Sequence, residues 1–250
     1  MKIKGREFGK GMPLICISVT ENAAADMVAK AADLAAKDID VIELRADHLS
    51  GDNIISEIND VLDGVRDVAA SKIILFTYRT LAEGGNGSAG EDIYMEVLEA
   101  AAYHEAVDII DIESNRLRDP EAIINKIKKQ KTVLLSYHDF NKTPSTEFMT
   151  GKLSQMYELG ADIAKIAVMP ESKRDVARLL EATAIIDEAY PDRPKITISM
   201  GALGLLSRLS GQCMGSCLTF ATDGAASAPG QVPYQSVKTI LNEINRNMEA

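Results

Sequence analysis

The sequence has no tryptophan and little of several residue types that mark particular classes of protein. It holds three cysteines in 250 residues, too few for a disulfide scaffold, and an odd number fits reduced thiols in a cytoplasm. It has no run of about 18 apolar residues, so we expect no contact with the membrane interior. The segment Met1–Arg6 lacks the apolar stretch of a secretory signal. These absences predict a cytoplasmic protein.

Positive charge is also scarce. The chain carries 27 Lys and Arg against 37 Asp and Glu, which gives a formal net charge of −10. A general nucleic-acid-binding protein has a basic surface, so we expect no nucleic-acid partner. The hydrophobic content of 46% is that of an average soluble domain. A chain of 250 residues suits one or two domains, and α/β barrels fill about this length as a single domain.

Short β-rich runs alternate with longer helical segments along the chain. Several runs are apolar without alternation, as in residues 73–76, which is typical of strands covered on both faces. The expected strands are Leu14–Val19, Val41–Arg45, Lys72–Tyr78, Val107–Ile112, Thr132–Tyr137, Ile163–Val168, Lys195–Met200 and Ser216–Thr219. The expected helices are Ala23–Lys37, Ile54–Ala69, Glu91–Glu105, Pro120–Lys129 (with Asp119 as its N-cap), Ser145–Leu159, Lys173–Ala189 and Pro233–Met248.

This alternation predicts a (β/α)8 TIM barrel formed by residues 1–250 as one domain. The alternative is a doubly wound parallel sheet, which usually has fewer strands and a glycine fingerprint after the first one. Here the first strand runs into Ser18–Asn22 without a glycine. Residues 1–12 precede the repeat, and we expect them to form a short hairpin across the bottom of the barrel.

Lys165 is the strongest single candidate for chemistry. Catalytic groups of such barrels lie at the carboxyl ends of the strands, and Lys165 interrupts the apolar strand Asp162–Val168. Burial favours the neutral amine, which attacks carbonyl carbons. The alternative is a lysine whose stem lies in the barrel wall while its ammonium pairs with a carboxylate. The residues alone leave both interpretations open.

His138 ends the strand before that of Lys165, in the segment Ser136–Phe140. Histidine is the commonest general acid and base at neutral pH, and neighbouring strands allow one substrate to touch both side chains. A purely structural histidine is an equal alternative. The other two histidines, His48 in a loop and His104 in a helix, are expected to lie at the surface or in packing.

Arg45, Arg79 and Arg208 indicate an anionic substrate, because the guanidinium fork matches a carboxylate or a phosphate. Ion pairing within an acidic barrel mouth is the alternative. The glycine-rich segment 84–90 after Glu83 lacks a Walker lysine and the dinucleotide spacing, so a phosphate cradle is disfavoured. We expect a mobile lid there instead.

No residues have the spacing of a metal site. Cys213 and Cys217 lack a partner cluster, which argues against zinc. Asp139 and Glu113 are oxygen ligands in principle but do not form a ligand motif. Cys16 lies on the first expected strand and Cys217 on the last, where we expect two free thiols in the core. We therefore expect neither a metal nor a cofactor.

Six groups of residues stand in order at successive strand ends and loops. They are Glu43–Asp47, Thr77–Arg79 with Glu83–Gly85, Ser136–Phe140, Lys165–Ala167, Ser199–Gly201 with Ser207–Arg208, and Ser227–Gln231. Together they resemble type I 3-dehydroquinate dehydratase, the Schiff-base enzyme of the shikimate pathway. Any one motif is weak, whereas their order over about residues 13–235 is specific.

The resemblance implies a (β/α)8 barrel that is usually a homodimer and needs no metal or cofactor. It implies that Lys165 forms a Schiff base with the ketone of 3-dehydroquinate, that His138 transfers protons and that Glu83 assists. The substrate contacts that it implies fall on Ser18, Glu43, Arg45, Arg79, Arg208, Ser227 and Gln231.

The implied reaction is a syn elimination of water that yields 3-dehydroshikimate for aromatic amino acid biosynthesis. The same reaction serves quinate catabolism. A Schiff-base aldolase is an alternative enzyme, but its phosphorylated substrate calls for a phosphate site after the seventh and eighth strands. That region offers Arg208 and Gln231 instead of a glycine nest. A non-catalytic barrel that binds a small acid is the remaining alternative.

Overall fold

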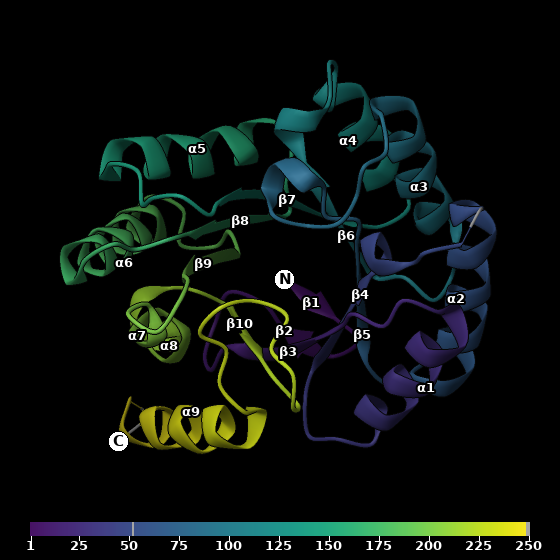
Figure 1. The fold of residues 1–250 in the computed structure, drawn as a ribbon. Helices are drawn as coiled ribbons and strands as arrows, with labels where there is room; N and C mark the ends of the chain where they lie inside the picture. Colours follow the sequence, from purple (N-terminus) through teal and green to yellow (C-terminus); the bar gives the residue numbers. More distant parts are fainter. Residues whose placement is uncertain (52, 249–250) are drawn as a thin grey trace.

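The computed structural model describes residues 1–51 and 53–248. Eight parallel strands form a nearly closed barrel in the order β10-β3-β4-β5-β6-β7-β8-β9, with helices around the outside (Figure 1). The strands are β3 (Leu14–Val19), β4 (Val41–Arg45), β5 (Ile73–Thr77), β6 (Ile109–Glu113), β7 (Thr132–Asp139), β8 (Ile163–Val168), β9 (Lys195–Ser199) and β10 (Leu218–Ala221). The predicted (β/α)8 barrel is confirmed.

Helices connect the strands and cover the barrel (Figure 1). They are α1 (Ala24–Ala35), α2 (Ile54–Val68), α3 (Glu91–Tyr103), α4 (Pro120–Lys128), α5 (Thr146–Glu158), α6 (Lys173–Ala189), α7 (Leu205–Leu209), α8 (Gly211–Met214) and α9 (Tyr234–Met248). The predicted N-cap is confirmed, because the Asp119 side chain accepts the N–H of Ala122. The helix before His104 ends at Tyr103, so the expectation of a helical His104 is wrong by one residue. No helix in the described part of the chain is long and apolar enough to cross a bilayer.

Apolar side chains form two separate clusters on the two faces of the barrel wall. Along β5, Ile73 and Leu75 pack in the barrel interior, while Ile74 and Phe76 pack between the strands and the helices. This alternation follows from the two-residue period of a strand. Most of the interior cluster fills the barrel around the early residues of the strands, and Ala167, Ile198, Met200 and Phe220 continue it toward the carboxyl ends. Inward-facing polar side chains near the carboxyl ends are therefore left to line a cavity.

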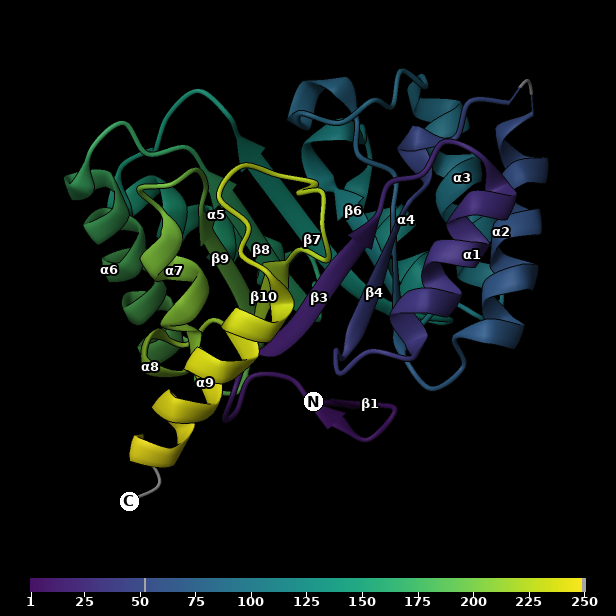
Figure 2. The same ribbon diagram turned by 60° about the horizontal axis from the view of Figure 1, so that its bottom comes forward.

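The N-terminal segment forms the predicted hairpin across the bottom of the barrel. Strand β1 (Lys2–Ile3) pairs antiparallel with β2 (Arg6–Glu7). The turn between them has positive φ at Lys4 and Gly5, as the commonest two-residue hairpin turn requires. Phe8 is 1% exposed and joins the interior cluster. Figure 2 shows the hairpin below the start of β3.

Five of the eight predicted strands have boundaries that differ from the structure by one or two residues. Strand β5 lacks the predicted Lys72 and Tyr78, β6 begins at Ile109 rather than Val107 and ends at Glu113 rather than Ile112, and β9 ends at Ser199 rather than Met200. The last strand begins at Leu218 rather than Ser216, because its ladder with β3 starts at the Leu218–Leu14 pair. Ser216 instead forms an isolated bridge with Lys195 that brings β9 and β10 together. Strand β7 continues to Asp139, because its ladder with β8 extends that far. This extension carries His138 into the sheet rather than onto a loop.

The two core cysteines are free and buried, as predicted. Cys16 lies on β3, opposite Phe220 of β10. Cys217 precedes β10 instead of lying on it, and its carbonyl accepts the N–H of Leu14. Burial is the main reason that the pKa of Cys16 is raised well above its usual value and that of Cys217 to about 12. Both thiols therefore stay protonated at neutral pH.

Candidate active site

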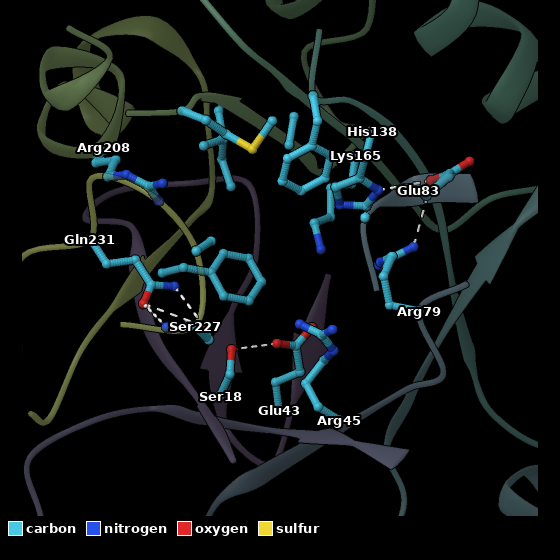
Figure 3. A pocket seen from close by; sticks show the side chains of 17 residues that line it. Ser18, Glu43, Arg45, Arg79, Glu83, His138, Lys165, Arg208, Ser227 and Gln231 are labelled. Atoms are coloured by element: carbon cyan, nitrogen blue, oxygen red, sulfur yellow. Dashed lines mark hydrogen bonds and ion pairs between the residues drawn. The ribbon is translucent and has the colours of Figure 1, made fainter. Parts of the chain in front are cut away.

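A cavity opens at the carboxyl ends of the strands, opposite the hairpin, and every residue proposed from the sequence for the site lines it (Figure 3). The lining residues are Ser18, Glu43, Arg45, Arg79, Glu83, Gly84, His138, Phe140, Lys165, Ala167, Ile198, Met200, Arg208, Phe220, Ser227, Ala228 and Gln231. They come from most strands of the barrel and from the loops that follow them. Residues far apart in the chain are thus brought to one site.

Lys165 lies in the wall of this cavity. Its neighbours Ile163 and Ala167 face the barrel interior, so the two-residue period of β8 turns Lys165 inward as well. The residue is 4% exposed, and its Nζ lies 3.4 Å from Asp111 Oδ2 and 4.6 Å from the centre of the Phe220 ring. The two interpretations of this lysine are therefore compatible, because it pairs with a carboxylate and also borders the cavity.

His138 and Glu83 form a hydrogen-bonded pair beside Lys165. His138 Nδ1 lies 2.8 Å from Glu83 Oε2. Burial, with the nearby charges of Arg79 and Lys165, holds the pKa of His138 well below its usual value. Burial raises the pKa of Glu83 to about 8, although Arg79 opposes this rise. The imidazole is thus neutral at pH 7, and its bond to Glu83 leaves Nε2 free for a ligand.

Arg79 is held by a set of acids. It donates to Asp111 Oδ2 at 2.7 Å and to Glu113 Oε1 at 2.9 Å, and its Nη1 lies 3.6 Å from Glu83 Oε2. Burial disfavours its charge, but these carboxylates outweigh burial and raise its pKa. The same pairing lowers the pKa of Asp111 against the effect of burial, with Lys165 contributing. Arg79 therefore has the role that was the alternative to substrate binding, which is ion pairing within an acidic barrel mouth.

Arg208 differs from the other cations of the cavity. It is 2% exposed, its Nη2 donates to the carbonyl of Pro229 at 2.9 Å, and its Nε has no hydrogen-bond partner. Arg45, Arg79 and Lys165 each pair with a carboxylate, whereas Arg208 pairs with none among residues 1–51 and 53–248. Burial lowers its pKa to about 10, so it remains charged at neutral pH.

Two pairs of polar side chains complete the cavity wall (Figure 3). Ser18 hydrogen-bonds Glu43, which also accepts the hydroxyl of Thr77 at 2.9 Å. In the loop after β10, Gln231 Nε2 donates to Ser227 Oγ at 2.9 Å. These pairs present a carboxylate, hydroxyls and an amide to a ligand.

The loop after β10 is anchored beside β9. The carbonyl of Pro229 accepts the N–H of Gly201 at 3.1 Å. Gly230 has φ +79° and lies so close to Gly201 that a Cβ atom would stand 2.2 Å from the Gly201 carbonyl oxygen. Only glycine fits this contact. Figure 2 shows this yellow loop at the end of the barrel opposite the hairpin.

Two glycines of segment 84–90, Gly85 and Gly87, pack closely against the end of β5. The N–H groups of Gly85 and Gly87 donate to the carbonyls of Thr80 and Arg79, each at 2.9 Å. A Cβ atom at Gly85 would lie 2.1 Å from the Arg79 carbonyl oxygen, and one at Gly87 would lie 2.7 Å from it. These contacts allow the loop to fold tightly onto the end of β5. That the loop moves as a lid stays a prediction.

Sequence reasoning gave no role to some groups in and beside the cavity. Asp111 lies near the end of β6, and its contact with Lys165 depends on three-dimensional register. Ser136 pairs with Lys165 across β7 and β8 and donates to Asp111 Oδ1 at 2.6 Å. The sequence did hold one signal, because side chains alternate between the two faces of a strand. Ser136 and His138, two residues apart, therefore lie on the same face of β7. Nothing in the sequence around Phe220, apart from its apolar side chain, indicated that it lines the cavity.

No group of three or more His, Cys, Asp or Glu side chains suited to a metal occurs within residues 1–51 and 53–248.

Comparison with known proteins identifies the family. The sequence matches the model described as type I 3-dehydroquinase over residues 15–248. It is 36% identical to a 3-dehydroquinate dehydratase of Clostridioides difficile and 38% identical to one of Bacillus licheniformis, each over 99% of this chain and 98% of the relative. The crystal structure of a type I 3-dehydroquinate dehydratase from Clostridium difficile with covalently modified comenic acid superposes with a TM-score of 0.93. It is 37% identical, over 99% of this chain and 98% of that one. The chain belongs to the type I 3-dehydroquinase family.

Proposed function

We propose that this protein is a hydro-lyase that converts 3-dehydroquinate to 3-dehydroshikimate through a Schiff base on Lys165. The family supplies the reaction, which is a step of the shikimate pathway of aromatic amino acid biosynthesis. The single observation that carries the assignment to residues is Lys165, a buried amine that borders the cavity beside His138. A fold alone would not suffice, because barrels of this type host many reactions.

The first step joins the substrate to the enzyme. The lone pair of Lys165 Nζ attacks the ketone carbon of 3-dehydroquinate. The ketone oxygen leaves as water with one proton from the amine and one from solvent, and the nitrogen keeps its other proton and a positive charge as an iminium. Asp111, 3.4 Å from Nζ, orients the amine and balances the positive charge of the iminium. The iminium withdraws electrons from the adjacent carbon. It therefore serves as the electron sink of the reaction, and the proposal needs no metal or cofactor.

The second step is the elimination. His138 Nε2 removes a proton from the carbon next to the iminium, and the bonding electrons move toward the iminium nitrogen. The hydroxyl on the following carbon then departs with the proton that His138 returns, which releases water. In a syn elimination both protons move on one face, so one histidine serves both transfers. In its ionised form, Glu83 accepts Nδ1–H and stabilises the charge on the imidazolium. Water finally hydrolyses the product imine.

Arg208 is proposed to clamp the substrate carboxylate. The protein carries a net charge of −10, so a local cation must hold the anionic substrate. Arg208 has no carboxylate partner in the described part of the chain. The forked guanidinium matches the geometry of a substrate carboxylate. Ser227 and Gln231 are proposed to close over the bound acid. The hydroxyl contacts fall to Ser18, Glu43, Arg45 and Arg79, which line the remaining wall.

The solved relative from Clostridium difficile supports covalent capture of a ligand, because its crystal structure holds covalently modified comenic acid. In this chain the cavity offers the cation Arg208 for a carboxylate and the amine Lys165 for a carbonyl.

Three further expectations are part of the proposal. Residues 1–250 form one domain. The pairing of the first barrel strand, β3, with the last, β10, supports this expectation. Residues 52, 249 and 250 lie outside the described residues. The enzyme is cytoplasmic, which its free thiols support. It forms a homodimer, as the family resemblance implies. Light scattering should then give about 54 kDa, twice the chain mass of 27.0 kDa, and a value of one chain mass would contradict the dimer.

The activity is tested by adding 3-dehydroquinate to the purified protein and following ultraviolet absorbance. The product is a conjugated enone, so absorbance should grow with time. A non-catalytic acid-binding barrel would give no change in absorbance. An aldolase would cleave a carbon–carbon bond, and product mass distinguishes that result from the loss of one water.

A further inference from the structure

Asp47 lies behind the cavity and outside its lining. It belongs to the short helix η1 (Ala46–His48) that follows β4, and its side chain is fully buried at 0% exposure. The mechanism above gives it no part. A buried carboxylate is costly unless its oxygens are fully hydrogen-bonded, so its partners show what keeps it there.

Four N–H groups converge on the Asp47 carboxylate, two on each oxygen. Oδ1 accepts Arg45 Nε at 2.8 Å and the backbone N–H of Arg79 at 3.1 Å. Oδ2 accepts Arg45 Nη2 at 2.7 Å and the backbone N–H of Asn86 at 3.1 Å. Burial opposes its ionisation, but these bonds and the charge of Arg45 lower the pKa of Asp47. The carboxylate is therefore ionised and saturated.

These bonds join three parts of the active site. The bidentate bond occupies the Nε and Nη2 edge of Arg45, which turns the other edge of this guanidinium toward the cavity that it lines. The bond to Arg79 N fixes the end of β5. The bond to Asn86 N fixes the glycine-rich loop just after Glu83, the partner of His138.

We infer that Asp47 is a positioning residue of the reaction, which holds the Arg45 guanidinium and the loop that carries Glu83 in their working places. It acts on the substrate through Arg45 and on proton transfer through the loop. This inference rests on the proposed function of the cavity, because Arg45 is a substrate contact only if the cavity binds 3-dehydroquinate.

Asp47→Asn tests the inference with almost no change in volume. The amide keeps one acceptor oxygen, but its NH2 group then faces one guanidinium N–H and one backbone N–H, so two donors lose their acceptor. Arg45 loses its bidentate partner. A charge-assisted hydrogen bond is worth roughly 1.5–3 kcal/mol, so KM for 3-dehydroquinate should rise about tenfold or more when Arg45 is released. Turnover per active site should also fall, because loss of the bond to Asn86 N lets the loop that carries Glu83 move away from His138.

The matched control is Asp40→Asn at the opposite end of the barrel. Asp40 is also largely buried, accepts the backbone N–H of Ile15 at 3.0 Å and lies 3.4 Å from Arg6 Nε. It therefore has the same kinds of bonds without access to the cavity. This variant should lose stability while KM and turnover per active site stay within twofold of the unsubstituted protein.

A second comparison separates positioning from a general loss of structure. In an Arg45→Ala background, Asp47→Asn should change KM less than twofold, because the group through which it acts is gone. Active sites are counted by borohydride-trapped product, so misfolded protein does not affect the constants. If Asp47→Asn yields no folded protein, Asp47→Glu keeps the charge and shifts the carboxylate by one methylene, and KM should still rise severalfold.

Each outcome decides the inference. Unchanged KM in folded Asp47→Asn or Asp47→Glu would overturn it, as would an equal rise in KM in the Arg45→Ala background. An equal rise in Asp40→Asn would show a general structural effect and also overturn it. Absence of turnover in the unsubstituted protein would instead reject the proposed function, so the two failures are distinguishable.

Discussion

The two ends of the barrel use buried charge in different ways. At the bottom, an aspartate directly before each of β4, β6 and β8 accepts a backbone N–H of the preceding strand and pairs with a lysine or arginine from the surface. The contacts are Asp40 with Ile15 N and Arg6, Asp108 with Ile74 N and Lys4, and Asp162 with Val133 N and Lys128. These charges satisfy one another and the backbone, and they hold neighbouring strands in register.

At the top, the charges face inward and are only partly satisfied by one another. Arg79 is bound by Asp111, Glu113 and Glu83, whereas Arg208 has no carboxylate partner within the described residues. The comparison teaches that burial of charge alone does not mark a functional site. A cavity and a cation with unused hydrogen-bonding capacity mark it, since that capacity is available to a ligand.

The largest expected effect comes from Lys165→Ala, which removes the only proposed nucleophile. Turnover should be lost completely, because without the iminium no electron sink exists for proton removal. Lys165→Met is the matched control that keeps the length of the stem and the packing against Phe220, and it should be equally inactive. Steady-state assays of both folded variants decide the matter, and activity in either one would reject the Schiff-base mechanism.

His138→Ala should have the next largest effect. Turnover should fall by about 10²–10⁴, the contribution of general acid–base catalysis, while imine formation continues. Rapid-quench borohydride trapping measures the imine and the assay measures turnover. A folded variant that traps no adduct would contradict the division of roles between Lys165 and His138.

Arg208→Lys sharpens the contrast between the paired and the unpaired arginine. Lysine keeps the charge but loses the fork, so KM should rise about tenfold, as expected for a charge-assisted hydrogen bond of roughly 1.5–3 kcal/mol. Turnover should also fall, because a displaced carboxylate misplaces the ketone over Lys165. Unchanged constants would mean that another arginine holds the carboxylate, with Arg45 or Arg79 next in line.

Glu83→Gln should change the pH profile more than the maximal rate. Burial raises the pKa of Glu83 to about 8, and its ionised form accepts Nδ1–H and leaves His138 Nε2 free as the base. The kcat/KM of the unsubstituted enzyme should therefore rise with pH through about 8. The amide oxygen of Gln accepts Nδ1–H at every pH, so the variant should lack this rise. A profile that is the same in both proteins would refute this role.

The raised pKa of Glu83 should increase kcat/KM as pH rises, but it should decrease the free energy of unfolding. The folded protein keeps the Glu83 proton up to about pH 8, whereas the unfolded chain loses it near pH ~4.3. Folding then binds a proton between these values, so this residue lowers the free energy of unfolding as pH rises. Denaturant titrations should show that Glu83→Gln gains stability relative to the unsubstituted protein as pH rises across this window.

Asp108→Asn at the bottom should have the smallest effect on kinetics. It weakens the bonds to Ile74 N and Lys4, each 2.8 Å long, and should cost about 1–3 kcal/mol of unfolding free energy. KM and turnover should not change. A change in KM after this substitution would break the comparison between the two ends of the barrel.

Sequence reasoning predicted the barrel because alternating strand and helix patterns are local signals. Strands β3, β4 and β8 were predicted to the residue, whereas β10 was displaced by two residues, because its boundary is set by the ladder with β3. Such register is a long-range property. Charged residues at strand ends predicted the candidate site for the same local reason.

The partners of these residues were not predictable. The contact between Lys165 and Asp111, two strands apart, follows from closure of the barrel rather than from spacing. The isolation of Arg208 is likewise invisible in a sequence, since it depends on which carboxylates other cations occupy. Segment 84–90 was predicted to be a mobile lid, because the sequence shows the conformational freedom of its glycines and not the Arg79 carbonyl against Gly85 and Gly87.

Covalent capture of the substrate tests the central claim most directly. The protein is mixed with 3-dehydroquinate, reduced with borohydride and digested, and the peptide that carries the adduct is located by mass spectrometry. We predict one adduct per chain on Lys165, with the mass of the reduced product imine, and none in Lys165→Met. An adduct on another lysine, or turnover without any trapped adduct, would contradict the account.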